Sequence, residues 1–287
     1  MKTKERILVT GASGSLGNLI LEELLRAGQA DLMATPRTWK TAALFSLRGV
    51  DIRSLDFYDP IDLLEAFRGV TKLLLIGTLD LGRTLAQNRN AIEAARKAGV
   101  RHIVYLSCAN PKTAAASTMT EHRQTEELIK ASGLKYTFLR NYLFAENLQF
   151  VLPRAVETGT LYGCAGNGRI AYVTRRNCAA AAAGALLKAE RFEDAVLEIT
   201  GPEAFSHSEL ADLVSEITGK SLCYVDLPSE EYKAELVASG LPELFAPIFV
   251  GVDRAAKHGE LGAVTDAVLQ LTGEHAEDIR EALKLCL

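Results

Sequence analysis

The sequence predicts a doubly wound parallel α/β sheet, followed by a smaller C-terminal subdomain. Strand-like and helix-like segments alternate through the first half of the chain. The strand-like segments are apolar on both faces, as in parallel sheets that are covered by helices on both sides. A glycine-rich turn joins the first strand to the first helix. Right-handed crossovers then place helices on both faces of the sheet.

The first element is a strand at Ile7–Thr10, followed by Gly11, Gly14 and Gly17 and then by a helix that reaches Ala27. A strand, a tight turn and a helix N-terminus expose backbone N–H groups that suit a pyrophosphate. Gly11 permits the turn, Gly14 lets phosphates approach the backbone, and Gly17 lets the helix pack closely on the strand. This segment therefore predicts a bound dinucleotide.

The remaining elements of the first half follow the same alternation. Strands are expected at 31–34, 50–54, 72–76, 102–107 and 136–140, and helices at 39–47, 60–67, 85–97 and 119–131.

Beyond Asn141 the alternation ends. One further core strand is expected at 196–200, and helices are expected at 177–189, 208–218, 230–239 and 276–285, with Ser206 or Ser208 as a cap. We therefore expect residues 1–150 to bind the dinucleotide. Residues 151–287 should form a smaller subdomain that covers the substrate, with 196–201 returning to the main sheet.

Composition excludes several classes of function. A chain of 287 residues with 48% hydrophobic residues can bury a full core. Its net charge of −4 gives no electrostatic footprint for nucleic acid. Its five cysteines form neither a disulfide framework nor a metal-spaced cluster, so we expect reduced thiols and no metal. No apolar run is long enough for a membrane span, and the early first strand leaves no room for a signal peptide, so a cytoplasmic protein is expected.

The end of the second strand indicates which dinucleotide is bound. It lacks the acidic residue that would hold the ribose hydroxyls of NAD, and it offers Arg37 and Lys40 instead. A guanidinium there can pair with the 2′-phosphate of NADP, so NADPH is favoured over NADH. The alternative is a solvated surface arginine, and Pro36 could redirect the loop. Asp56, after the third strand, is placed to bind the adenine amino group or, alternatively, to cap a turn.

Several segments together resemble a known family. They are VTGASGSLG at 9–17, Arg37, LSC at 106–108, TEHRQTEELI at 120–129, YTFLRN at 136–141, VTRRNCAAAAA at 173–183 and SGLPE at 239–243. These segments resemble the atypical short-chain dehydrogenase/reductases of the NmrA-like group, which includes bacterial NADPH-dependent quinone and triphenylmethane dye reductases. The resemblance covers essentially the whole chain and implies a Rossmann-type fold.

The resemblance also implies roles for individual residues. Gly11, Ser13, Leu16 and Gly17 would line the pyrophosphate, Arg37 the 2′-phosphate, Asp56 the adenine, and Ile76, Gly77 and Thr78 the ribose. Ser107 stands where the wider superfamily keeps a catalytic serine beside the cofactor. The usual Tyr-x-x-x-Lys pair is missing, and His122 and Glu126 occupy its positions.

Loss of that pair removes the phenol that normally protonates a carbonyl oxygen. A quinone or a cationic dye needs less help, because it is already poised to accept a hydride, and the site then acts mainly by orientation. His122 could supply a proton near neutral pH, or it could be an ordinary helix-surface histidine. Ser107 could donate a hydrogen bond to the acceptor, or it could be a plain strand-end serine.

The segment after the sixth strand is the expected wall of the substrate pocket. Asn141, Tyr142 and Phe144 are the candidate substrate-binding residues, whereas Phe150 is expected in the ordinary core. The apolar run at 241–250 should form a lid over the pocket or, alternatively, a dimer face.

The sequence therefore predicts an NADPH-dependent oxidoreductase that transfers a hydride to a quinone or similar conjugated aromatic or carbonyl acceptor. One alternative is an NADP(H)-binding redox sensor without turnover. Another is a biosynthetic enzyme acting on ketones or polycyclic aromatics. The expected partner is a small molecule rather than nucleic acid or a membrane, and the expected state is a monomer or homodimer.

Overall fold

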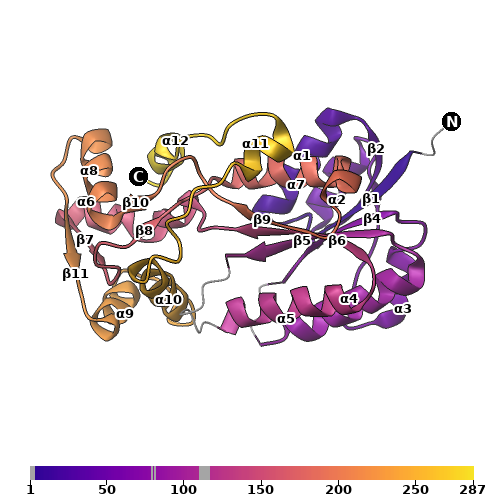
Figure 1. The fold of residues 1–287 in the computed structure, drawn as a ribbon, viewed down its shortest axis with the longest axis horizontal. Helices are drawn as coiled ribbons and strands as arrows, with labels where there is room; N and C mark the ends of the chain where they lie inside the picture. The colour runs from indigo at the N-terminus through magenta and orange to yellow at the C-terminus, as the bar shows by residue number, and fades with distance from the viewer. Residues whose placement is uncertain (1–3, 79, 81, 110–116) are drawn as a thin grey trace.

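The central feature of the computed structural model is a seven-stranded sheet with the order β3-β2-β1-β4-β5-β6-β9 (Figure 1). The structure describes residues 4–78, 80, 82–109 and 117–287. All neighbouring strands pair in parallel, which confirms the predicted fold class. The strands are β1 (Glu5–Thr10), β2 (Ala30–Thr35), β3 (Asp51–Ile52), β4 (Lys72–Ile76), β5 (His102–Cys108), β6 (Lys135–Asn141) and β9 (Ala195–Ile199).

Helices cover both faces of this sheet (Figure 1). One layer holds α1 (Ser15–Ala27), α2 (Trp39–Ser46), α7 (Arg175–Leu187) and α11 (Ala267–Thr272). The other layer holds α3 (Pro60–Ala66), α4 (Thr84–Ala98) and α5 (Ser117–Ala131). Strand order reverses between β1 and β4, and this switch point is where open α/β sheets bind ligands, outside the carboxyl ends of the strands.

The core has a part on each side of the sheet, because successive strand residues point to opposite faces. Ile7 and Val9 of β1 belong to one hydrophobic cluster, with residues of α1 and α7. Leu8 of the same strand belongs to a second cluster, with residues of α3, α4 and α5. This double burial explains why consecutive residues in the middle of the strands are apolar.

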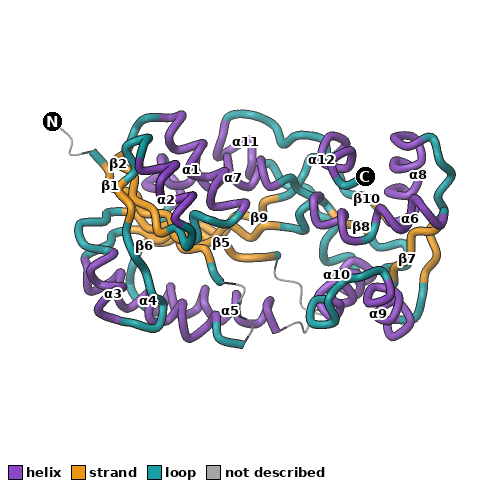
Figure 2. Tube along the Cα trace, turned by 180° about the vertical axis from the view of Figure 1, so that it is seen from behind, coloured by secondary structure: helices purple, strands orange, loops and turns teal. Residues whose placement is uncertain are grey.

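The C-terminal half builds a second unit at one end of the sheet (Figure 2). Two short ladders, β7 with β11 in parallel and β8 with β10 in antiparallel, form its strands. Its elements are η1 (Ala145–Phe150), α6 (Leu152–Thr158), β7 (Thr160–Gly163), β8 (Arg169–Ile170), β10 (Phe205–Ser206), α8 (His207–Thr218), β11 (Cys223–Asp226), α9 (Ser229–Ala238), α10 (Ala246–Lys257) and α12 (Arg280–Leu285).

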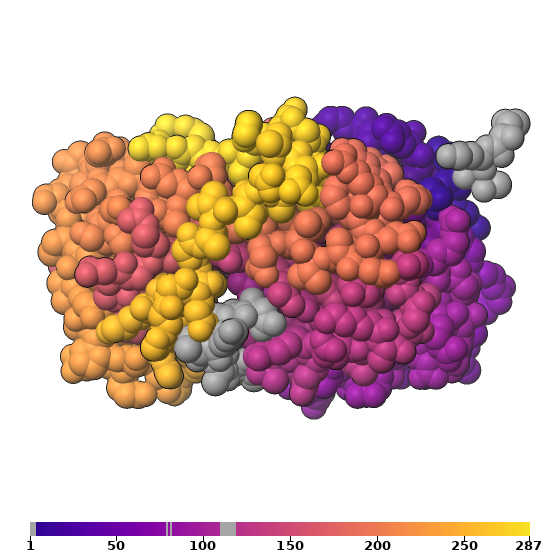
Figure 3. Space-filling model, viewed as in Figure 1, coloured from indigo at the N-terminus to yellow at the C-terminus, as the bar shows by residue number. Residues whose placement is uncertain are grey.

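The chain returns from this second unit to the main sheet. Strand β9 pairs with β6, and the short helix η2 (Ala189–Phe192) leads into it from α7. In Figure 3 the yellow C-terminal segment runs across one face of the molecule from α10 to α11. Within the described part of the chain, no helix is both long and apolar enough to cross a membrane.

Sequence patterns missed several short elements. The four strands of the two ladders have two to four residues each, which is too short to show a hydrophobic period. Helix α11 was not expected, and the helix expected at 276–285 begins only at Arg280. The third strand shortens to Asp51–Ile52. The expected cap at Ser206 is confirmed, since its side chain and Glu209 form a capping box at the start of α8.

Candidate functional site

The glycine turn after β1 is shaped to receive a pyrophosphate. Gly11 has a φ of 63°, and its carbonyl oxygen accepts a hydrogen bond from the Gly14 backbone N–H at 2.9 Å. A Cβ atom at Gly17 would lie only 2.4 Å from the same carbonyl oxygen, so no side chain fits there. Gly14 is the N-cap of α1 and provides no side-chain cap. The first N–H groups of α1 therefore remain available to an anion.

Ser13 connects this turn to the loop that carries Arg37. Its Oγ accepts hydrogen bonds from the backbone N–H groups of Arg37, at 2.7 Å, and Thr38, at 3.2 Å. A serine hydroxyl that accepts two hydrogen bonds still has its own hydrogen to donate, as to a phosphate oxygen. Arg37 and Lys40 are exposed on the same loop and on the first turn of α2. Both cations therefore lie beside the end of β2, where no acid stands.

Three buried side-chain oxygens at this end of the molecule have no hydrogen-bond partner among the described residues: Thr35 Oγ1, Asn88 Oδ1 and Asn141 Oδ1. Thr35 ends β2 and Asn141 ends β6. Asn88 lies in α4 close to Gly77, which follows β4. An unpaired buried polar atom costs about 1–3 kcal/mol. Three of them along one sheet edge fit a long polar ligand such as a dinucleotide.

Glu146 Oε2 also has no hydrogen-bond partner among the described residues, but it lies 3.8 Å from the Arg175 guanidinium. Glu146 Oε1 accepts a hydrogen bond from the Arg175 backbone N–H at the start of α7. This glutamate therefore contributes to the capping of α7.

The loops after β3 and β4 are tied together. Asp56 Oδ1 accepts a hydrogen bond from the Tyr58 backbone N–H at 2.8 Å, so this carboxylate caps a turn. The Tyr58 hydroxyl donates to Asp80 Oδ2 at 2.9 Å. Thr78, expected at the ribose, donates its hydroxyl hydrogen to Gln87 Oε1. Ile76 packs against Gly11, at 3.3 Å from where a Cβ would stand.

Ser107 belongs to a row of polar side chains that crosses three strands. Parallel register places Ser107, Arg140 and Glu198 side by side on β5, β6 and β9. Buried Glu126 of α5 joins them: it accepts from Ser107 Oγ at 2.7 Å and from two nitrogens of Arg140 at 2.9 and 2.6 Å. Arg140 also contacts Glu198 at 3.2 Å.

This row changes the role expected of Ser107. Its single hydrogen is donated to the Glu126 carboxylate, so the hydroxyl presents only lone pairs to a ligand. The expectation that Ser107 donates to the acceptor therefore does not match this arrangement. Hydrogen bonding to Glu126 raises the pKa of Arg140, and burial raises the pKa of Glu198.

Sequence reasoning missed Arg140 and Glu198. The usable signal was an arginine inside the apolar strand YTFLRN, because a buried charge requires a partner. Identifying that partner required the fold, since Glu126 lies on a helix and Glu198 on a strand from the other half of the chain.

His122 is held by a buried tyrosine. Its Nδ1 is 2.7 Å from the hydroxyl of Tyr105, which is fully buried in β5. Burial lowers the pKa of His122 to about 4, so the ring is neutral at pH 7. Burial also raises the pKa of Tyr105, which stays protonated and can donate to Nδ1, leaving the imidazole proton on Nε2. An imidazolium donor near neutral pH, as expected from the sequence, is therefore not available here.

The aromatic segment after β6 lies partly at the surface. Tyr142 is buried, and the guanidinium of Arg175 lies 5.1 Å above the ring of half-buried Phe144. Phe150 is 45% exposed and packs edge-on against Phe249, so the expectation that it belongs to the ordinary core was wrong.

The apolar run at 241–250 contributes to a separate small core of the C-terminal unit. Leu241 and Ala246 are buried there with Tyr232 and Leu236. Leu244 in the same run is 64% exposed, which leaves an apolar side chain for a ligand or a partner.

Other features of the molecule lie away from this edge. A cavity of about 350 Å³, lined by Lys4, Arg6 and Arg48 among others, lies at the opposite, amino end of the strands. No group of three or more His, Cys, Asp or Glu residues in the described ranges could hold a metal ion. All five cysteines are free thiols.

Two known reductases are similar to this chain over nearly their full length. The chain is 34% identical to quinone oxidoreductase 2 of Escherichia coli, over 96% of this chain and 97% of that protein. It is 28% identical to the NAD(P)H azoreductase of Xenophilus azovorans, over 97% and 96% of the two chains.

Two solved reductase structures are also similar to this chain in fold and sequence. The crystal structure of the Escherichia coli NADPH-dependent quinone oxidoreductase in complex with NADPH superposes with a TM-score of 0.91, at 34% identity, covering 97% of this chain and 99% of that chain. The triphenylmethane reductase of Citrobacter sp. with NADP(H) gives a TM-score of 0.88, at 33% identity, covering 98% and 100%. The model of the NmrA-like family matches residues 3–270, and the chain belongs to this family.

Proposed function

We propose that this protein is an NADPH-dependent oxidoreductase that transfers a hydride to a quinone or a similar conjugated aromatic or carbonyl acceptor. The observation that carries the proposal is the replaced acid–base pair. Of the two residues at the positions of that pair, Glu126 forms an ion pair with Arg140, and His122 is neutral. A site without a strong acid suits acceptors that take a hydride before they need a proton.

Residues along the carboxyl edge would hold the cofactor, which supplies the hydride when bound. The turn residues Gly11, Ser13, Gly14, Leu16 and Gly17 would bind the pyrophosphate; Arg37 and Lys40 the 2′-phosphate; Asp56 the adenine; and Ile76, Gly77, Thr78 and Ser107 the ribose and nicotinamide half. The neutral side chain of Thr35 at the end of β2 leaves that end free of repulsion toward a 2′-phosphate.

The acceptor would be oriented rather than chemically activated. Tyr142 and Phe144 would give a flat ring an apolar surface, and fixing the two reactants face to face supplies most of the rate enhancement. The Nε2–H of neutral His122 on α5 would be a weak donor to the reduced product. Ser107 Oγ would accept a hydrogen bond rather than donate one.

The proposal places the protein in the cytoplasm, as a monomer or homodimer that acts on a small molecule and not on nucleic acid or a membrane. Its net charge of −4, which gives no electrostatic footprint for nucleic acid, and its similarity to a quinone oxidoreductase support a small-molecule acceptor.

The test is a spectrophotometric assay of NADPH oxidation against a panel of quinones and triarylmethane dyes. NADPH absorbance should fall with at least one class of acceptor, and NADH should be oxidised more slowly. Arg37→Ala should raise KM for NADPH by about tenfold and leave KM for NADH unchanged, since one charge-assisted contact is removed. Tight NADPH binding without oxidation by any acceptor would favour a sensor and overturn the proposal.

A further inference from the structure

Asn141 is the least satisfied polar side chain near the proposed hydride-transfer site. It is 7% exposed, and its Oδ1 has no hydrogen-bond partner among the described residues. It is the last residue of β6, beside Cys108 of β5 and Ile199 of β9. A buried amide oxygen at this position is a hydrogen-bond acceptor without a donor.

Backbone hydrogen bonds hold the position of Asn141 at the strand end. Its carbonyl oxygen accepts from the Ala109 N–H at 2.9 Å, and the next N–H, that of Tyr142, donates to the Ile199 carbonyl at 3.0 Å. Among the described residues no donor reaches Oδ1. Its cost of about 1–3 kcal/mol would be recovered from a hydrogen bond to a ligand or a water molecule.

The sheet topology indicates which end of a dinucleotide comes close to Asn141. The glycine turn follows β1, and the expected 2′-phosphate and adenine contacts, Arg37 and Asp56, follow β2 and β3 on one side of it. The other half of the dinucleotide must then extend over β4, β5 and β6. Asn141 ends the last of these three strands. The nicotinamide carboxamide carries an amino donor in that half of the molecule.

We infer that Asn141 Oδ1 accepts a hydrogen bond from the carboxamide amino group of the nicotinamide and thereby fixes the orientation of the ring. This inference rests on the proposed function for the identity of the cofactor.

Alternation along β5 and β6 places Asn141 on the face of the sheet away from Ser107. Ser107 pairs with Arg140, so Asn141, the next residue, points to the opposite face. Ser107 and His122 contact residues of the α5 side. Asn141 would therefore hold the carboxamide away from both of them. In this role Asn141 positions the ring and does not take part in proton transfer.

The test compares the binding of NADP⁺ with that of its 3-acetylpyridine analogue, in which a methyl group replaces the amino group. The ribose hydroxyls are the same in both. Titration calorimetry without any acceptor should give the wild-type protein about tenfold higher affinity for NADP⁺. Asn141→Leu should bind both dinucleotides equally, whereas Asn141→Asp, which keeps an acceptor oxygen, should retain the preference.

Thermal melting of the cofactor-free protein provides an independent readout. Asn141→Leu removes an unpaired oxygen, so its melting temperature should not fall. Asn177 is a matched control, because its Oδ1 accepts from Thr174 Oγ1 at 2.8 Å and from the Glu277 N–H at 3.1 Å. Asn177→Leu should melt at a lower temperature and keep the preference for NADP⁺.

Two results would overturn the inference. One is a wild-type protein that binds both dinucleotides equally. The other is an Asn141→Leu variant that keeps the tenfold preference. A protein that shows the preference but reduces no quinone would refute the proposed reaction and leave the role of Asn141 intact.

Discussion

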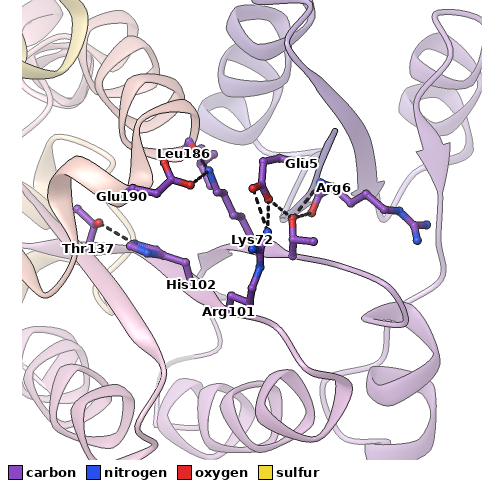
Figure 4. Close-up of polar contacts among 9 residues, drawn as sticks. Glu5, Arg6, Lys72, Arg101, His102, Thr137, Leu186 and Glu190 are labelled. Atoms are coloured by element: carbon purple, nitrogen blue, oxygen red, sulfur yellow. Dashed lines mark hydrogen bonds and ion pairs between the residues drawn. The ribbon is translucent and has the colours of Figure 1, made fainter. Parts of the chain in front are cut away.

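The amino and carboxyl ends of the central strands differ in how completely their buried polar side chains are paired. At the amino ends, buried polar side chains are paired inside the protein (Figure 4). The Lys72 amine donates to the Leu186 carbonyl at the end of α7 and contacts Glu190, both at 3.1 Å. His102 Nε2 lies 2.8 Å from Thr137 Oγ1, which in turn donates to the Phe192 carbonyl at 2.8 Å.

Glu5, at the start of β1, is also paired inside the protein. Glu5 accepts two hydrogen bonds from Arg101, at 2.9 and 2.8 Å, and one from Thr71 at 2.5 Å (Figure 4). At the carboxyl edge, the row from Ser107 to Glu198 is paired in the same way. Beside it, Thr35, Asn88 and Asn141 each keep an oxygen that has no hydrogen-bond partner among the described residues. These three oxygens cost stability and are available to a ligand.

The largest expected effect concerns acid stability at the amino edge. Burial and the charge of Lys72 lower the pKa of His102 to about 4, below its ordinary value of 6.5. The unfolded chain therefore binds a proton that the fold excludes, and stability falls as the pH drops from 6.5 through 4, by on the order of 3 kcal/mol. Urea denaturation across this range should show a shallower decline in His102→Gln, which still donates to Thr137. An unchanged decline would contradict the assignment.

The glycine turn should give the largest effect on binding. Gly17→Ala places a Cβ against the Gly11 carbonyl, so the turn must move, and NADPH affinity should fall by about 100-fold. Gly262→Ala is the control, because a Cβ there would meet Arg169 only at an ordinary 3.5 Å. Calorimetry gives both constants. Equal affinity in Gly17→Ala and wild type would place the pyrophosphate elsewhere.

Removing a paired group from the amino edge should affect folding alone. Lys72→Met keeps the apolar stem but leaves the Leu186 carbonyl without its donor, so the free energy of unfolding should fall by about 2 kcal/mol. NADPH affinity should not change. A parallel loss of affinity would show that the two ends of the strands are coupled, against the contrast drawn above.

Removing an unpaired group from the carboxyl edge should weaken NADPH binding without lowering stability. Thr35→Val is nearly isosteric and deletes the unpaired Oγ1, so cofactor-free stability should stay level or rise. NADPH affinity should fall about fivefold, the effect of one neutral hydrogen bond. The measurements are urea denaturation and calorimetry. A clear loss of stability would show that the hydroxyl serves the fold.

The smallest expected effect concerns kcat/KM, to whose pH dependence His122 should contribute nothing near neutral pH. Because the pKa of His122 is lowered to about 4 by burial, its protonation does not change between pH 6 and 8. The profile of kcat/KM over this range should be the same in wild type and His122→Asn. A step near pH 6.5 that disappears in the variant would restore the histidine as a charged acid.

Local patterns predicted most of the fold and the glycine turn after β1. The glycine turn and the two-faced apolar strands are contiguous in sequence, so their meaning does not depend on distant residues. The row from Ser107 to Glu198 could not be predicted in this way. It exists only because β5, β6 and β9 align in register and α5 packs over them. The direction of the Ser107 hydrogen bond and the pKa of His122 both depend on that packing.

The path of the chain has a consequence for protein engineering. The chain leaves the main sheet after β6, returns as α7 and β9, leaves again, returns as α11 and ends in the second unit as α12. The first two excursions are joined by the β7–β11 and β8–β10 ladders, and α12 contacts η1 of the first. A chimera with a single crossover near residue 150 would pair these segments with foreign sheet neighbours. Transplanting acceptor specificity from a relative therefore requires all three segments to move together, while α7, β9 and α11 stay with the host.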